Sequence, residues 1–169
     1  MIVIAQILGF LAVSLYILSY QLKKRAHIVG VTCVSNVLYV LQYLLLGAFS
    51  GAVMDILSTV SSFLAAKKNA KRFKRYAKFV AVLTVIIILA SGLIIAIMSK
   101  NWVELLPIGG AVFPIIGLWC DNEQTIRKFG LIGAPFWMIY NFISDAYGAA
   151  IGSVISIISL IVALIRYKK

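Results

Sequence analysis

The chain has 169 residues, 63% of them hydrophobic, and a mean hydropathy of +1.04. This composition leaves too little polar surface to cover a soluble globule, so it excludes soluble enzymes and soluble binding proteins. The net charge of +11 would suit a nucleic acid. However, the apolar stretches leave no soluble domain to bind one, and we expect a membrane protein without a nucleic-acid partner.

The basic residues predict the topology. Lys100 is isolated, and the other fifteen of the 16 lysines and arginines form four clusters: Lys23, Lys24 and Arg25; Lys67, Lys68, Lys71, Arg72, Lys74, Arg75 and Lys78; Arg127 and Lys128; and Arg166, Lys168 and Lys169. Short basic loops stay in the cytoplasm during insertion. All four clusters should therefore lie there, and an even number of crossings should separate each from the next.

The apolar stretches between the clusters give the spans in chain order. Residues 2–21 cross once, from outside to inside; basic residues follow this stretch instead of preceding it, so we predict a retained helix and not a cleaved signal peptide. Each later interval holds two membrane-length helices, and the predicted spans are 28–47, 51–66, 79–98, 105–120, 129–144 and 147–166. This gives an all-α protein with seven transmembrane helices, an external N-terminus and a cytoplasmic C-terminus.

A weak internal repeat accompanies this pattern. A shift of 98 residues superposes the first three spans on the last three, with Tyr39 on Trp137 and Asp55 on Ser153. The sequence predicts one three-helix bundle in residues 1–78, with its basic loop, and a second in residues 99–169. The helix at 79–98 would link them. Because a single helix links them, both bundles start from the same side of the membrane and are parallel. Parallel repeats of this kind occur among transporters.

A family resemblance rests on three local stretches. They are Ser19-Tyr20-Gln21 before Lys23-Lys24-Arg25, then Leu44-Leu45-Leu46-Gly47-Ala48, and the closing helix from Tyr147-Gly148 to Arg166. These resemble the YgjV-like bacterial inner-membrane proteins, and the 3+1+3 plan resembles the SWEET and PQ-loop transporters. The chain departs from the PQ-loop pattern, with Tyr20 before Gln21 and no Gln after Pro114. The resemblance implies solute transport without ATP in the bacterial inner membrane.

Polar side chains at helical spacing predict the inward faces of two repeat-equivalent spans. The predicted site residues are Asn36, Tyr39, Gln42 and Tyr43 on the second span, and Trp137, Tyr140 and Asn141 on the sixth. Aromatic faces with a few amides suit a neutral polar ring such as a sugar, a nucleoside or a vitamin. The alternative is that these side chains join helices by hydrogen bonds without touching a ligand.

Asp55 is the acid inside an apolar span, where it is costly unless paired, protonated or hydrated. Either it reaches water beyond the membrane, or it faces the cavity and couples transport to protons or binds a cationic group. Pro114 and Pro135 interrupt backbone hydrogen bonding inside helices, and we predict that they act as hinges.

Two cysteines and one histidine offer too few ligands for a metal site, and no cofactor or nucleophile motif is present, so we expect neither an enzyme nor a cofactor. The predicted function is alternating-access transport of a small polar solute, as a facilitator or a proton-linked carrier. The alternative is a sensor, accessory subunit or lipid-binding scaffold. It would act through the basic loop at 67–78, which suits anionic headgroups. A polar cavity between the halves favours transport, and a dry, filled bundle favours the alternative.

Overall fold

A computed structural model describes residues 2–168; Met1 and Lys169, the latter part of the last basic cluster, lie outside the described residues. The described chain consists of helices joined by short loops, without a strand. The elements are α1 (Ile2–Gln21), α2 (Arg25–Leu46), α3 (Phe49–Ala66), α4 (Ala77–Ser99), the 3₁₀ helix η1 (Trp102–Leu105), α5 (Leu106–Trp119), α6 (Glu123–Ile143) and α7 (Tyr147–Arg166).

The helix ends follow from local chemistry. The α2 helix ends at Gly47, whose φ of 71° is the left-handed conformation that glycine adopts without strain. The α6 helix begins after Asn122, whose side chain accepts hydrogen bonds from the amides of Gln124 and Thr125. Both α2 and α6 start before the predicted apolar spans, because the polar and charged residues that precede each apolar stretch are helical as well.

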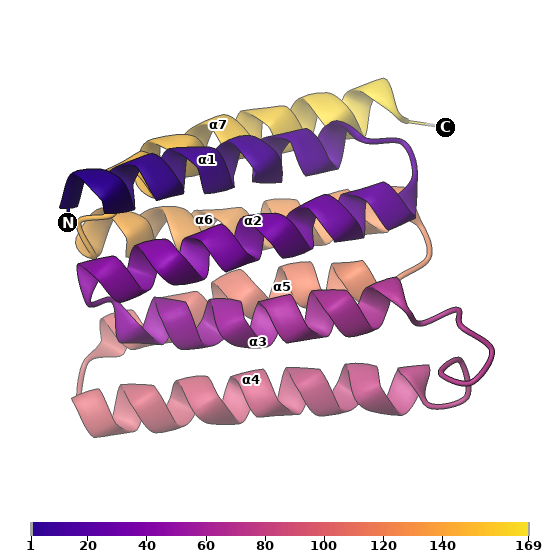
Figure 1. Cartoon of the computed structure of the whole chain (residues 1–169), viewed down its shortest axis with the longest axis horizontal. Helices are drawn as coiled ribbons and strands as arrows, with labels where there is room; N and C mark the ends of the chain where they lie inside the picture. Colours follow the sequence, from indigo (N-terminus) through magenta and orange to yellow (C-terminus); the bar gives the residue numbers. More distant parts are fainter. Residues whose placement is uncertain (1, 169) are drawn as a thin grey trace.

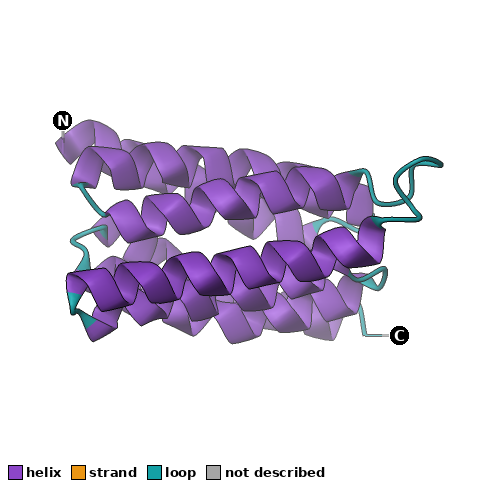
Figure 2. Cartoon of the chain, turned by 90° about the horizontal axis from the view of Figure 1, so that it is seen from below, coloured by secondary structure: helices purple, strands orange, loops and turns teal. Residues whose placement is uncertain are grey.

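The helices pack as a closed ring in the order α1, α2, α3, α5, α6, α7, with α7 returning to α1 (Figure 1). The α4 helix lies outside this ring, against α3 and α5. Neighbours along the chain run in opposite directions, so α1, α3, α5 and α7 point the same way (Figure 1). The connecting loops lie at the two ends of the molecule (Figure 2). Only Ile88 and Gly92 are buried among the residues of α4. The α4 helix is therefore an edge helix.

Six helical segments of the described chain are long and apolar enough to cross a membrane. The α6 helix is the exception, because Glu123, Arg127 and Lys128 occupy its first turns. It nevertheless runs beside the others along the same length (Figure 1).

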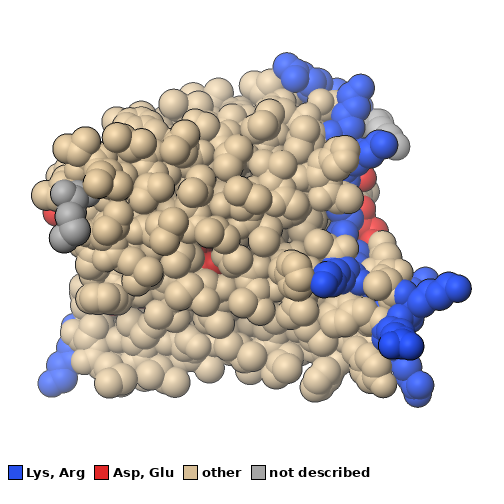
Figure 3. All heavy atoms as spheres, viewed as in Figure 1, with Lys and Arg blue, Asp and Glu red and all other residues tan. Residues whose placement is uncertain are grey.

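Charge is concentrated at one end of the molecule (Figure 3). We call the end with the α1–α2, α3–α4 and α5–α6 connections the basic end. The opposite end, with the α2–α3, α4–η1 and α6–α7 connections, is the far end. Between the two ends the surface is largely apolar, with large hydrophobic side chains exposed on α1, α2, α3, α4, α6 and α7, and Figure 3 shows a small acidic spot midway along it. This banded surface is the one that a bilayer requires of an integral membrane protein.

Backbone features recur 98 residues apart. The α2 and α6 helices begin at Arg25 and Glu123, α3 and α7 begin at Phe49 and Tyr147, and α1 and α5 end at Gln21 and Trp119. The far-end turns also correspond, because Gly47 and Asp145 have positive φ angles of 71° and 55°. The correspondence of residues 2–66 with residues 100–164 is therefore stronger in backbone conformation than in side chains.

Candidate functional site

A small polar cavity lies in the middle of the ring. Its volume is about 40 Å³, room for a few water molecules. Six of the eight predicted site residues line it: Asn36, Tyr39, Tyr43, Asp55, Trp137 and Asn141. Tyr16, Ala134, Ser153 and Ser156 complete the wall. The lining thus comes from both members of the predicted repeat.

A second chamber of about 20 Å³ continues toward the basic end. It shares Tyr16, Asn36, Asp55 and Trp137 with the central cavity and is closed by apolar side chains of α5, including Ile115 and Leu118. Asp55 therefore stands where the two chambers meet.

Hydrogen bonds join the two halves across the cavity wall. The Tyr43 hydroxyl donates to Asn141 Oδ1, and these two residues are 98 positions apart. Asn141 Nδ2 donates to the Ser153 hydroxyl at 3.2 Å, and Ser153 donates to the Ala149 carbonyl at 2.8 Å. Both the oxygen and the nitrogen of the Asn141 amide are thus hydrogen-bonded within the protein.

Aromatic rings form one side of the cavity. Tyr43 stacks on Tyr39, with centroids 6.0 Å apart, and on Trp137, with centroids 5.8 Å apart. Tyr16, which donates no hydrogen bond to the cavity wall, accepts one from Tyr20 at 3.0 Å. The aromatic lining expected from the sequence is therefore present, with Tyr16 as an additional member.

Asp55 is only 5% exposed and has an unusual environment. Within residues 2–168, no lysine, arginine or histidine forms an ion pair with its carboxylate, and no side chain or backbone amide donates a hydrogen bond to it. The carboxylate is therefore a buried polar group that faces the chambers.

The other two predicted site residues, Gln42 and Tyr140, lie outside the cavity lining. Gln42 points toward α1 and is fully buried beside Gly9. Its amide atoms have no hydrogen-bond partner among the described residues. It occupies this place because Gly9 leaves room for the amide: a Cβ atom there would lie 2.3 Å from Gln42 Nε2.

Tyr140 separates the central cavity from a wider space at the far end, which we call the vestibule. The vestibule has a volume of about 500 Å³ and is lined by residues of the α2–α3 turn, the end of α4, η1 and the end of α6, among them Ser50, Glu104, Tyr140 and Asp145. The Tyr140 hydroxyl lies 2.7 Å from Ser50 Oγ and accepts from the Gly51 amide at 3.1 Å. Its ring contacts Tyr43 and Trp137 edge-on, so one tyrosine closes the cavity toward the vestibule.

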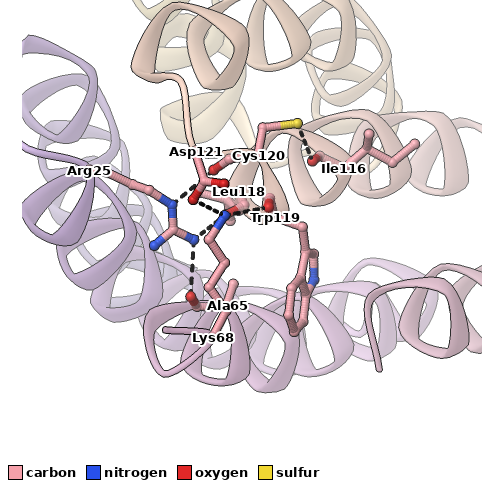
Figure 4. A network of polar contacts seen from close by, with 8 residues as sticks. All are labelled: Arg25, Ala65, Lys68, Ile116, Leu118, Trp119, Cys120 and Asp121. Atoms are coloured by element: carbon pink, nitrogen blue, oxygen red, sulfur yellow. Dashed lines mark hydrogen bonds and ion pairs between the residues drawn. The ribbon is translucent and has the colours of Figure 1, made fainter. Parts of the chain in front are cut away.

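The basic end is closed by polar contacts on the last turn of α5 (Figure 4). Arg25 donates to the carbonyls of Leu118 and Cys120 at 2.6 and 2.9 Å, and to the Ala65 carbonyl at 3.0 Å. Lys68 donates to the Trp119 carbonyl at 2.6 Å. We call Arg25 and Lys68 the α5 clamp. It satisfies carbonyls that have no partner within the helix, and its positive charge is favourable at a helix C-terminus.

An equivalent arrangement holds the last turn of α1. Buried Arg127 donates to the carbonyls of Tyr20 and Leu22 at 3.0 and 2.9 Å and lies 4.5 Å from the centre of the Tyr167 ring. The Tyr167 hydroxyl donates to the Gln21 carbonyl at 2.9 Å. We call Arg127 and Tyr167 the α1 clamp. The carbonyls 20, 21 and 22 are the positions 98 residues before 118, 119 and 120, so each half binds the same three carbonyls of the other.

Lys68 also pairs with Asp121, at 2.7 Å, in the loop after α5. The hydrogen bond from Lys68 lowers the pKa of the Asp121 carboxyl below its ordinary value. Because this carboxylate is 84% exposed, solvent weakens the pair, and it contributes little beyond fixing the direction of Lys68.

Some of these residues were missed from the sequence. Tyr16 and Tyr20 are four residues apart in an apolar helix, a signal that could have pointed to Tyr16. The arginines were used only to predict topology, and nothing in the sequence shows that they bind carbonyls. The predicted hinges differ in position: Pro114 is buried in the lining of the second chamber, whereas Pro135 is on the exposed side of α6. Among residues 2–168 no three His, Cys, Asp or Glu side chains lie close enough to hold a metal ion.

Comparison with known families identifies the chain. It belongs to the Imp-YgjV family of bacterial inner membrane proteins, whose family model matches residues 3–169. The predicted YgjV-like resemblance and the multi-pass location in the bacterial inner membrane are thereby confirmed. Neither the comparison with curated proteins nor that with solved structures gives a match, and the relation to SWEET and PQ-loop transporters stays a prediction.

Proposed function

We propose that this inner membrane protein is a transporter, either a facilitator or a proton-linked carrier, that moves a small polar solute by alternating access. In this proposal the two three-helix bundles, α1–α3 and α5–α7, form a 3+1+3 arrangement with α4 as the linker. The N-terminus is external and the basic end cytoplasmic. The observation that carries the proposal is the polar cavity in the middle of the ring, lined from both bundles and closed at each end by different contacts.

The two closures support this mechanism because they involve the seams between the bundles. At the far end, Tyr140 of α6 bonds to Ser50 and Gly51 of α3. At the basic end, the α5 clamp joins α2 and the α3–α4 loop to α5, and the α1 clamp joins α6 and the C-terminus to α1. Rocking of one bundle against the other would break one set and leave the other intact, as alternating access requires.

The size of the cavity bears on the state of the molecule. A space of about 40 Å³ holds water but not a sugar or a nucleoside. In our proposal this conformation is therefore closed to both sides, and a solute enters from the vestibule when Tyr140 moves.

A ligand screen followed by flux measurement tests the proposal. The purified protein is heated with sugars, nucleosides, vitamins and amino acids, because a ligand that binds the folded state raises the midpoint of unfolding. Compounds that stabilise the protein are then tested for saturable uptake into proteoliposomes. Trp137→Ala and Asn141→Ala should abolish saturable binding with an unchanged folded yield. Ser14→Ala, an exposed serine on α1, should bind normally. Normal binding by both cavity variants would remove them from the site.

The alternative is a non-transporting scaffold that acts through its basic loop. One observation favours it: Lys71, Arg72, Lys74 and Arg75 are exposed, and within the described chain none of them forms an ion pair. Such a loop attracts anionic lipid headgroups or an acidic partner. Replacing these four by Gln would abolish vesicle binding under this alternative, whereas under our proposal solute uptake would persist.

A further inference from the structure

The charge balance of the central cavity bears on the class of solute. Asp55 places a carboxylate inside a membrane-spanning helix. This residue is only 5% exposed, and no described residue forms an ion pair with it. An unpaired charge at this depth costs several kcal/mol. With a neutral solute the carboxyl can avoid this cost only by taking up a proton or water, whereas a cationic solute would pair with the ionised carboxylate and offset it.

The polar groups of the lining without a partner in the described chain are the Asp55 carboxylate, which only accepts hydrogen bonds when ionised, and the Asn36 amide and Ser156 hydroxyl, which can accept or donate. The amide of Asn141 is used by Tyr43 and Ser153. Asn36 also lines both chambers, and its side chain forms no hydrogen bond with another of the residues 2–168. Carboxylate and amide oxygens together match a group that carries several N–H donors, as an ammonium does.

The aromatic wall has the same preference. The rings of Tyr16, Tyr39, Tyr43 and Trp137 line the cavity together with Asp55. Ring faces are negative, and they attract alkylammonium groups when water is excluded. A cavity lined by aromatic rings and a carboxylate is therefore complementary to a small organic cation.

The approach from the far end is also acidic. Glu104 and Asp145 line the vestibule, and Glu104 Oε2 is buried without a hydrogen-bond partner in the described chain. Lys100, the lysine of this end, lines a separate apolar pocket with Trp102. A vestibule lined by carboxylates raises the local concentration of cations and lowers that of anions.

Resting on the function proposed above, we propose that the transported solute is a small organic cation whose ammonium group pairs with Asp55 against the aromatic wall. Asn36 would accept a second hydrogen bond from this group. Entry from the vestibule would pass Tyr140, since its ring lies between the two spaces.

An equilibrium binding experiment tests the ligand class without requiring transport. The full-length protein in detergent is titrated with ethanolamine hydrochloride at neutral pH and constant ionic strength, and the midpoint of unfolding is followed. Ethylene glycol serves as the neutral probe of similar size, and sodium chloride as the inorganic cation. Asp55→Asn is the test variant, Trp137→Leu is a second one, and Asp121→Asn, which removes an exposed carboxylate at the basic end, is the matched control.

We expect ethanolamine to raise the unfolding midpoint of the wild type and of the Asp121→Asn variant, and ethylene glycol to leave it unchanged. In Asp55→Asn the apparent affinity should fall by about tenfold or more, and Trp137→Leu should weaken it as well. Equal effects of ethanolamine and ethylene glycol would overturn the proposal. So would an undiminished response in Asp55→Asn, or an Asp55-dependent response to sodium chloride alone.

The two proposals can fail separately. Asp55-dependent amine binding without uptake into proteoliposomes would support the ligand class and contradict transport. Saturable uptake of a neutral sugar without amine binding would support transport and overturn the cationic solute.

Discussion

At the scale of single residues, the contact between Gly9 and Gln42 shows how a polar side chain is kept out of the cavity. Helical spacing predicts an inward-facing stripe on α2, and its members Asn36, Tyr39 and Tyr43 line the cavity. Spacing cannot tell which neighbouring helix a residue at the edge of the stripe faces. Gln42 faces α1, because a glycine there leaves room for its amide, and this pairing exists only once the ring has formed.

We predict that Gly9→Ala destabilises the protein, because the new methyl group would lie 2.3 Å from Gln42 Nε2. Overpacking of this kind costs about 1–3 kcal/mol. The additional change Gln42→Ala should restore most of the loss, since the Gln42 amide has no hydrogen bond to lose among residues 2–168. Denaturant unfolding of the single and double variants measures the coupling.

Gly30→Ala is the control for this cycle. A Cβ atom at Gly30 would meet nothing within 4 Å, and alanine is the better helix former. This variant should be as stable as the wild type or more so. Equal destabilisation by Gly9→Ala and Gly30→Ala would contradict the packing explanation.

At the scale of elements, the α1 clamp ties the end of α1 to α6 and to the segment after α7, and the α5 clamp ties the end of α5 to α2 and to the α3–α4 loop. We predict that Arg25→Gln speeds the alkylation of Cys120 by maleimide, measured in a Cys33→Ser background. Arg25 holds the Cys120 carbonyl, and its loss frees the end of α5. Lys24→Gln, a change of the exposed neighbour of Arg25, should leave the alkylation rate unchanged.

The α1 clamp should contribute more to stability, since Arg127 is 2% exposed. Arg127→Gln leaves the carbonyls of Tyr20 and Leu22 without their donors, at a cost of about 1–3 kcal/mol for each buried acceptor. Chemical unfolding should show this loss, and Lys128→Gln, an exposed neighbour, should show none. A normal stability of Arg127→Gln would mean that water replaces the guanidinium.

The pair of Lys68 and Asp121 predicts a small acid sensitivity of the α5 clamp. The pKa of Asp121 is lowered in the folded protein. Its contribution to stability is therefore present above the unfolded pKa, near 4, and is lost as the pH falls through the lower folded pKa. The unfolding midpoint of Asp121→Asn should lie slightly below that of the wild type at pH 7 and converge with it as the pH falls below the folded pKa of Asp121. A constant difference across this range would exclude Asp121 as the titrating group.

At the scale of the whole molecule, charge and apolar length predicted seven helices close to their observed bounds. They did so because a bilayer imposes the same length on every crossing and keeps short basic loops on one side. The order of helices around the ring and the position of α4 outside it could not be predicted. These depend on contacts such as Gly92 of α4 against Ile108 of α5, which hydropathy does not encode.

The predicted orientation can be tested with fusions. Green fluorescent protein attached after Lys169 should fluoresce, since it folds in the cytoplasm, and alkaline phosphatase at the same point should be inactive. A cysteine at Lys100 should react with a membrane-impermeant reagent added to intact spheroplasts. An active phosphatase fusion would overturn the orientation.

The clamps have a consequence for which substitutions the protein tolerates. Their acceptors are main-chain oxygens, which no codon change can delete, whereas their donors are individual side chains. A saturation library selected for folded protein should therefore accept many amino acids at Leu22 and Cys120 and few at Arg127. Amino acids accepted at the ends of α1 and α5 would then say little about which contacts close the basic end. Amino acids accepted at the donor positions would identify those contacts.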